Sequence, residues 1–305
     1  MAIPGRINLQ NTPRIPNVTS RSVAFDSSGV RLVGTLYEPA DSTSPRPGVI
    51  VTGAWTTVKE QMPGTYAREL AARGFSALAF DFTGWGESDG EVRYKEDPRT
   101  KTADILAAAD FMSSLDDVES GALAGLGLCA SSGYMAAAVA DHPALQSLAL
   151  VAAWLHDPPM AEAVYGGPES VASLIRISRE AEAADDILIA ASATDERAVM
   201  YRAPYYTEAD RGLIPAYDNR FHAASWEPWL TYDAQASADR LTAPTLIICS
   251  EAAALPASAR AFAERLDAPL TELWLDDVDQ FDFYDRRDVV EQCADAVVEH
   301  VRATT

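Results

Sequence analysis

Residues 121–133, GALAGLGLCASSG, carry the pattern that decides the fold. A run of apolar residues of strand length ends at Leu128, and a segment with a helical pattern begins just after Cys129. A reactive side chain between small residues, on a sharp turn from strand to helix, is typical of a nucleophile elbow. The neighbours must be small because larger side chains would collide with the backbone of this strained turn. Cys129 is therefore the predicted nucleophile, and we expect the positive end of the following helix to lower the pKa of its thiol.

The other two cysteines, Cys249 and Cys293, fall inside a predicted strand and the last predicted helix, where cysteine commonly serves as a small buried apolar residue. The same structural role is the alternative for Cys129. Three cysteines without a CxxC pair indicate neither a disulfide framework nor a zinc ribbon. With no apolar run long enough for a signal peptide or a membrane span, we expect a cytoplasmic protein with reduced thiols and no metal or other cofactor.

Outward from the elbow, short apolar runs alternate with amphipathic stretches of helical length. This alternation predicts an α/β fold, a mostly parallel sheet with helices on both faces. Strands are predicted at 48–52, 75–82, 121–128, 148–153, 244–250 and 270–275, and helices near 63–73, 100–115, 131–141, 257–266 and 287–301. The runs 23–25 and 30–37 flank the turn signal DSSG, which predicts an antiparallel hairpin.

The alternation stops at Trp154 and resumes near residue 244. We divide the chain into an N-terminal arm (1–20), an α/β core (21–154 and 236–305) and a helical cap insertion (155–235). In the insertion, helices are expected at 168–184 and 195–202, and residues 201–232 are rich in aromatic side chains. Ligands of open α/β sheets bind beyond the carboxyl ends of the strands, so the insertion is expected to cover the site.

The charge of the chain excludes some classes of partner. Among 305 residues, 24 are basic and 45 acidic, which gives a net charge of −21. Such a charge repels nucleic-acid phosphates and anionic lipid head groups, so we expect neither nucleic acid nor a membrane as a partner. The expected partner is a small-molecule substrate. The oligomeric state is open, with a homodimer as one option.

Two loops follow predicted strands near the elbow. The loop at 53–57 is expected to supply a backbone N–H, from Ala54 or Trp55, which together with the N–H of Ala130 would form an oxyanion hole. The loop at 84–90, GWGESDG, reads as a structural turn, because its glycine spacing does not match a dinucleotide-binding fingerprint.

Taken together, these motifs resemble the α/β-hydrolase superfamily, and more closely its dienelactone-hydrolase-like members that have cysteine at the elbow. The resemblance spans residues 20–300 and rests on the segments VKEQ (58–61), Tyr66-Ala67, FDF (80–82), WGES (85–88), GLCA (127–130) and FDFYD (281–285). It implies the α/β-hydrolase fold, with an eight-stranded, mostly parallel sheet and a helical cap. It also implies activity on ester-, lactone- or thioester-like carbonyl groups without a cofactor.

The sequence departs from this family at the catalytic triad. The position that usually holds histidine corresponds to Gln280, and an amide cannot take a proton from a thiol. The usual acid position falls among residues 252–254, which are alanines, so Glu251 is the nearest carboxylate. The catalytic candidates are therefore Cys129, Gln280, Glu251 and a substitute base.

Of the four histidines, His156 is the candidate substitute base, because it follows the strand beside the elbow strand; a structural loop histidine is the alternative. His142 and His300 are expected at the surface. Substrate contacts are assigned to His222 in the cap and to Trp154 and Trp226, for which core packing is the alternative.

Three hypotheses follow from the motifs. In the first, Cys129 attacks an ester-, lactone- or thioester-like carbonyl, with Gln280 as a neutral hydrogen-bond partner. In the second, the protein is a non-hydrolytic lyase, isomerase or cyclase that keeps the oxyanion hole without the triad base. In the third, it is a binding protein that keeps only the pocket.

Overall fold

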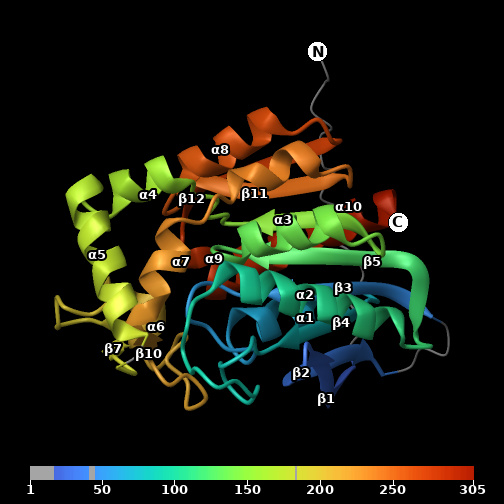
Figure 1. Ribbon diagram of the computed structural model, residues 1–305. Helices are drawn as coiled ribbons and strands as arrows, with labels where there is room; N and C mark the ends of the chain where they lie inside the picture. The colour runs from blue at the N-terminus through green and yellow to red at the C-terminus, as the bar shows by residue number, and fades with distance from the viewer. Residues whose placement is uncertain (1–16, 41–44, 183) are drawn as a thin grey trace.

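The computed structural model describes residues 17–40, 45–182 and 184–305. Most of the chain folds around one eight-stranded sheet (Figure 1). Its strands are β1 (Val18–Ser27), β2 (Val30–Pro39), β3 (Arg46–Thr52), β4 (Ser76–Phe80), β5 (Val118–Leu128), β6 (Leu145–Val151), β11 (Thr245–Ala252) and β12 (Leu270–Asp279). The spatial order is β1-β2-β4-β3-β5-β6-β11-β12. The first two pairings, β1 with β2 and β2 with β4, are antiparallel, and all the others are parallel.

This topology confirms the predicted α/β-hydrolase fold and its mostly parallel sheet. The hairpin predicted around DSSG is formed by β1 and β2. Strand β1 begins at Val18, so the chain enters the sheet before the end of the predicted arm, and residues 1–16 lie outside the described residues.

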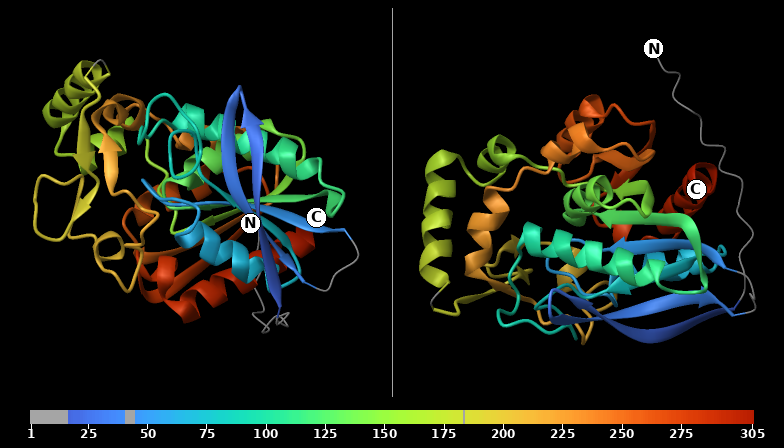
Figure 2. Two further views of the ribbon diagram at one scale, coloured as in Figure 1. Left: turned by 90° about the horizontal axis from the view of Figure 1, so that it is seen from below. Right: turned by 45° about the vertical axis from the view of Figure 1, so that its right-hand side comes forward.

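Helices cover both faces of the sheet, as the alternating pattern predicted. They are α1 (Met62–Ala71), α2 (Pro98–Ser113), α3 (Ser131–Asp141), α8 (Pro256–Arg265), α9 (Asp282–Asp285) and α10 (Arg287–Thr304). Figure 2, left, shows α2 and α3 on one face and α1 and α10 on the other, and each pair is in contact. The central strand β5 is therefore buried on both sides, and Leu126 and Leu128 are fully buried. None of the described helices is both long and apolar enough to cross a bilayer.

Residues between β6 and β11 form no strand of the main sheet. They contain α4 (Pro158–Val164), α5 (Pro168–Ala181), β7 (Ile187–Ile189), β8 (Ala191–Ser192), β9 (Met200–Tyr201), α6 (Pro204–Thr207), β10 (Arg220–His222), η1 (Ala223–Ser225), α7 (Trp226–Leu230) and η2 (Gln235–Arg240). Most of this insertion lies at one end of the sheet, on the left of Figure 1. The sequence predicts a cap at residues 155–235, separate from the α/β core, and this division stays a prediction.

The helix predicted at 195–202 is wrong. The backbone N–H groups of Val199, Met200 and Arg202 donate to the carbonyls of Ile189, Ala190 and Ser192, which pairs this segment with the chain before it. Strand β9 forms there instead, alongside β8. Tertiary hydrogen bonding thus overrides a weak local helical pattern.

Candidate active site

Cys129 lies on the turn between β5 and α3, and its backbone has a left-handed φ of 54°. Its N–H donates to the carbonyl of Val151 in β6, and the N–H of Ser132 donates to the Cys129 carbonyl, each at 3.0 Å. A Cβ atom on Gly127 would come within 2.8 Å of the Ser131 carbonyl oxygen. The turn therefore has the geometry of a nucleophile elbow, and the glycine before it is required by close packing.

Two backbone N–H groups, from Ala130 and Trp55, are hydrogen-bonded to the Cys129 sulfur. Two backbone N–H groups beside the nucleophile are what an oxyanion hole requires. Of the two residues predicted in the loop after β3, Trp55 is the one whose N–H bonds to the sulfur, and its role as an oxyanion donor stays a prediction. Ala54 is buried, and its carbonyl accepts a hydrogen bond of 2.6 Å from the Thr57 hydroxyl.

Burial raises the pKa of the Cys129 thiol. Hydrogen bonds from Tyr284, Ala130 and Trp55 offset only part of this shift. The N–H of Ala130, at the start of α3, lowers this pKa as expected, but the cost of removing a thiolate from water is larger, so the net shift is upward. At neutral pH the side chain is a thiol and needs a route for its proton.

Gln280 occupies the position where the family pattern has histidine, and its amide is fixed at both ends. Its Oε1 accepts from the N–H of Ala254 at 2.9 Å, and its Nε2 donates to the Ala152 carbonyl at 3.1 Å and to the Tyr284 hydroxyl at 2.7 Å. The amide therefore donates its hydrogen bonds to Ala152 and Tyr284 and not to the Cys129 sulfur. The contact with Ala254 also identifies which of the three alanines faces the expected histidine position.

The Tyr284 hydroxyl, which sequence analysis missed, is the side-chain group bonded to the Cys129 sulfur. It accepts from Gln280, so its own proton is free to be donated to the sulfur or to a substrate. Burial raises the pKa of Tyr284 well above its ordinary value, so the hydroxyl stays protonated. Tyr284 belongs to the FDFYD segment used for the resemblance, but nothing in the pattern indicates that its hydroxyl reaches Cys129.

A buried ion pair holds the loop after β3 (residues 53–61) against helix α3. Glu96 accepts from the N–H of Thr56 at 3.3 Å and from the hydroxyl of Tyr134, on the first turns of α3, at 2.9 Å. The ammonium of Lys101 lies 2.7 Å from the Glu96 carboxylate, and both side chains are almost fully buried. The loop that carries Trp55 is thus fixed to α3 by a carboxylate that no sequence pattern singled out.

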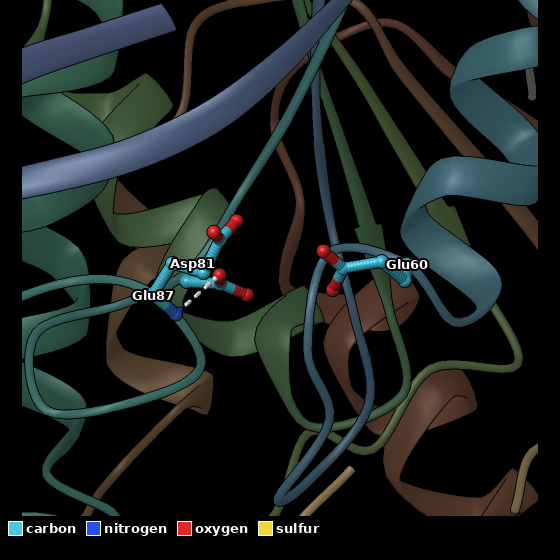
Figure 3. A group of neighbouring side chains, drawn as sticks. All are labelled: Glu60, Asp81 and Glu87. Atoms are coloured by element: carbon cyan, nitrogen blue, oxygen red, sulfur yellow. Dashed lines mark hydrogen bonds between the residues drawn. The ribbon is translucent and has the colours of Figure 1, made fainter. Parts of the chain in front are cut away.

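Three carboxylates, Glu60, Asp81 and Glu87, gather on the loops after β3 and β4 (Figure 3). They have the composition of a metal site, but the ammonium of Lys59 lies 2.6 Å from Glu60, 2.8 Å from Asp81 and 2.6 Å from Glu87. Burial opposes the charged form of Lys59, yet the three carboxylates outweigh it and raise its pKa. The positive charge among these carboxylates is therefore that of Lys59. Its ion pair with Asp81 joins the loop after β3 to the end of β4.

Several predicted site residues lie away from Cys129. His156 is buried beside Trp229, with its Nε2 2.8 Å from the Trp229 carbonyl oxygen, and burial lowers the pKa of its ring. Glu251 is exposed and pairs with Arg260. Neither residue lines the cavity over Cys129, so neither is placed to act as its base or acid.

The assignments in the cap also change. The Nδ1 of His222 accepts from the N–H of Ala224 at 3.0 Å, and His222 does not line the cavity. Trp226 packs between Trp55 and Tyr165 and faces a different hollow in the insertion. Trp154 lines the cavity, and its contact with a substrate stays a prediction.

The two remaining histidines were both expected at the surface. His300 is 8% exposed, with its Nε2 3.3 Å from the Pro244 carbonyl oxygen, so that expectation is wrong for this residue. His142 is partly exposed and lies 3.1 Å from Asp110.

A cavity of about 560 Å³ lies over Cys129, between the sheet and the insertion. Its walls are rich in aromatic side chains, among them Trp55 and Trp154 from the core and Tyr165, Tyr201, Tyr206 and Trp229 from the insertion. The insertion thus covers the carboxyl ends of the strands, where ligands of this sheet class bind. An apolar cavity of this size, with a few polar groups converging on one atom, suits a small organic substrate.

Comparisons with known proteins agree with this geometry. Residues 59–276 match the family described as serine aminopeptidase, S33. The uncharacterized protein YcjY of Escherichia coli (strain K12) is 28% identical over 255 residues, which cover 77% of this chain and 82% of that protein. The acyltransferase drtE of Aspergillus calidoustus is 27% identical over 111 residues, which cover 36% of each protein.

The fold is also seen in solved structures. The crystal structure of hypothetical protein PA2218 from Pseudomonas aeruginosa superposes with a TM-score of 0.79 at 23% identity, covering 98% of this chain and 99% of the other. Because the family match spans well over half of the chain and the sheet has the expected topology, this protein belongs to the serine aminopeptidase S33 family of the α/β-hydrolase superfamily.

Proposed function

We propose that the protein is an enzyme of acyl chemistry that acts on an ester-, lactone- or thioester-like carbonyl of a small molecule, with Cys129 as the nucleophile. The observation that carries this proposal is the convergence of the Ala130 and Trp55 N–H groups on the Cys129 sulfur at a strained elbow. The similarity to a protein named acyltransferase supports the same class of chemistry. We further propose that the chain is a dienelactone-hydrolase-like member that works in the cytoplasm.

Of the proposed substrate classes, a thioester needs the least help from a general base at this site. The Cys129 sulfur bonds to the carbonyl carbon, the bond to the leaving sulfur breaks, and the thiol proton passes to that leaving sulfur. No external base is consumed, because a thiol replaces a thiol. The developing oxyanion would be held by the N–H groups of Ala130 and Trp55.

Tyr284 gives the proton a path in this proposal. Its hydroxyl can donate to the leaving sulfur while accepting the proton of Cys129, and Gln280 keeps it in place through the hydrogen bond of 2.7 Å. Gln280 therefore positions Tyr284 and does not contact the sulfur directly. Transfer of the acyl group to an amine or a thiol would follow more readily than hydrolysis, because these acceptors need less activation than water and no imidazole lines the cavity among the described residues.

No histidine or carboxylate lines the cavity in the described part of the chain, and this supports a second candidate function, a non-hydrolytic lyase, isomerase or cyclase. In this alternative the Tyr284 hydroxyl and the two N–H groups would stabilise an enolate or oxyanion without a covalent intermediate. The raised pKa of the Cys129 thiol is the observation that favours it. The two candidates differ in whether Cys129 ever carries the acyl group.

Replacing Cys129 separates these functions. In Cys129→Ala, turnover of N-acetylcysteamine thioesters and p-nitrophenyl esters is expected to fall to the uncatalysed rate. Cys129→Ser is expected to fall as far, because an alkoxide is still harder to form without a base. Cys249→Ala is the matched control, since Cys249 is buried in β11 away from the cavity, and it should keep parental turnover. Full turnover in Cys129→Ala would overturn the proposal.

A further inference from the structure

The cavity over Cys129 contains one charged side chain. Arg202 follows β9 and lines the cavity, whereas every other lining residue in the described part of the chain is neutral. The side chain is exposed and stacks on its neighbour Tyr201, with the guanidinium carbon 4.8 Å from the ring centroid. A guanidinium presented beside an aromatic face is a common binding group for carboxylate and phosphate.

Arg202 has no anionic partner of its own within the described residues. Arg197 and Arg211 of the insertion do pair, with Asp195 and Asp285, whereas Arg176 and Arg220 have no ion pair among the described residues but do not line the cavity. What distinguishes Arg202 from these arginines is that its unpaired charge lines the cavity over Cys129. Its five donors are available to a ligand.

The backbone of Arg202 is also held in an unfavourable conformation. Its φ is 55°, in the left-handed region that side chains with a Cβ seldom adopt. The conformation is maintained by a hydrogen bond of 2.9 Å from its N–H to the Ser192 carbonyl, at the end of the β8–β9 pair. Such local strain is frequently found where a side chain must be aimed at a ligand.

From these three observations we propose that Arg202 selects substrates that carry an oxyanion group, a carboxylate or a phosphate, in addition to the reacting carbonyl. This specificity rests on the proposed acyl chemistry at Cys129. The aromatic walls would hold the carbon skeleton, and Arg202 would bind the anion away from the sulfur. The anion has two sources, the acyl part of the substrate or the phosphates of a thiol carrier.

The net charge of −21 does not oppose this inference. At physiological ionic strength, charges further than about 8–10 Å from the ligand are largely screened. The cavity walls themselves carry no carboxylate among the described residues, so the nearest formal charge to a bound anion is that of Arg202.

The test compares three thioesters. Butyryl-N-acetylcysteamine is neutral, glutaryl-N-acetylcysteamine carries a carboxylate on the acyl part, and butyryl-CoA carries phosphates on the thiol part. In the parent protein, kcat/KM is expected to be higher for at least one anionic thioester than for the neutral one. Arg202→Gln should lower that anionic kcat/KM about tenfold, mainly through KM, and leave the neutral one unchanged.

Two variants serve as controls for this test. Arg202→Lys keeps the charge without the planar fork and should recover part of the preference. Arg176→Gln removes the same charge from the exposed face of α5, outside the cavity, and should change nothing. The thioester whose preference is lost in Arg202→Gln identifies the source of the anion.

A binding measurement keeps this inference separate from the catalytic one. Calorimetric titration with glutaric acid monoamide, butyramide and free CoA needs no turnover, so it remains informative if no thioester is processed. Tighter binding of an anionic probe than of butyramide, lost in Arg202→Gln, supports the proposal. No anionic preference in the parent protein, or an equal loss for neutral and anionic probes, would overturn it.

Discussion

A variant that combines Gln280→His, Ala254→Asp and Tyr284→Phe is expected to hydrolyse p-nitrophenyl esters at least about 100-fold faster than the parent protein. The backbone N–H of Ala254 donates to the side chain of Gln280 and both residues line the cavity, so an aspartate at 254 would lie beside a histidine at 280. Removing the Tyr284 hydroxyl frees the space between residue 280 and the sulfur. The imidazole would then take the proton from Cys129 and later activate water for deacylation.

Steady-state kinetics of the combined variant decide this prediction. Adding Cys129→Ala to the same background is the matched control and should remove the gain. If the variant folds with parental thermal stability yet gains no hydrolysis, the site lacks more than a base, and the nucleophilic role of Cys129 loses its support. Rapid hydrolysis of these esters by the parent protein would instead contradict the idea that the loss of the triad histidine suppresses hydrolysis.

Lys59→Met is expected to lower the free energy of unfolding by about 3–5 kcal/mol, the usual cost of removing one partner from a buried ion pair. The Asp81 carboxylate is fully buried and would lose its cation, although it would keep hydrogen bonds from the N–H groups of Lys59 and Glu87. Because Glu60 and Glu87 are partly or well exposed, water can replace the ammonium for them, so most of the loss comes from Asp81.

Urea unfolding at neutral pH measures this loss. Lys95→Met is the matched control, since Lys95 pairs with the exposed Glu182 and should lose no more than about 1 kcal/mol. In the double variant Lys59→Met with Asp81→Asn, part of the lost stability should return because no uncompensated charge stays buried. A loss in Lys59→Met as small as that of Lys95→Met would show that the cluster does not stabilise the fold.

The sheet could be predicted from sequence because its signals are local. Strands buried on both faces read as uninterrupted apolar runs, and Gly127 before Cys129 marks the turn that only a small residue allows. The histidine position at Gln280 and the acid position among residues 252–254 came from the resemblance to the family, which rests on the order of motifs along the chain. These features depend on spacing along the chain, which the sequence contains.

Features that depend on side-chain contacts could not be predicted. Nothing in the sequence indicates that Gln280 turns its amide to Tyr284, or that Tyr284 is the side chain that reaches the sulfur. The pKa of Cys129 was expected to fall because the helix terminus is visible in the sequence while the burial of the sulfur is not. In the insertion, His222 lies on β10 and Arg202 directly follows β9, and both short strands are set by pairing with other parts of the insertion, so the directions of these side chains could not be predicted either.

The central claim, that Cys129 carries the acyl group, is tested most directly by intact-mass spectrometry after mixing the protein with excess butyryl-N-acetylcysteamine and quenching in acid. Because no base activates water, we expect one butyryl group to accumulate per chain, on the peptide that contains Cys129. Cys129→Ala should show no adduct. An unmodified parent protein that still turns over the thioester, or an adduct that persists in Cys129→Ala, would contradict the account.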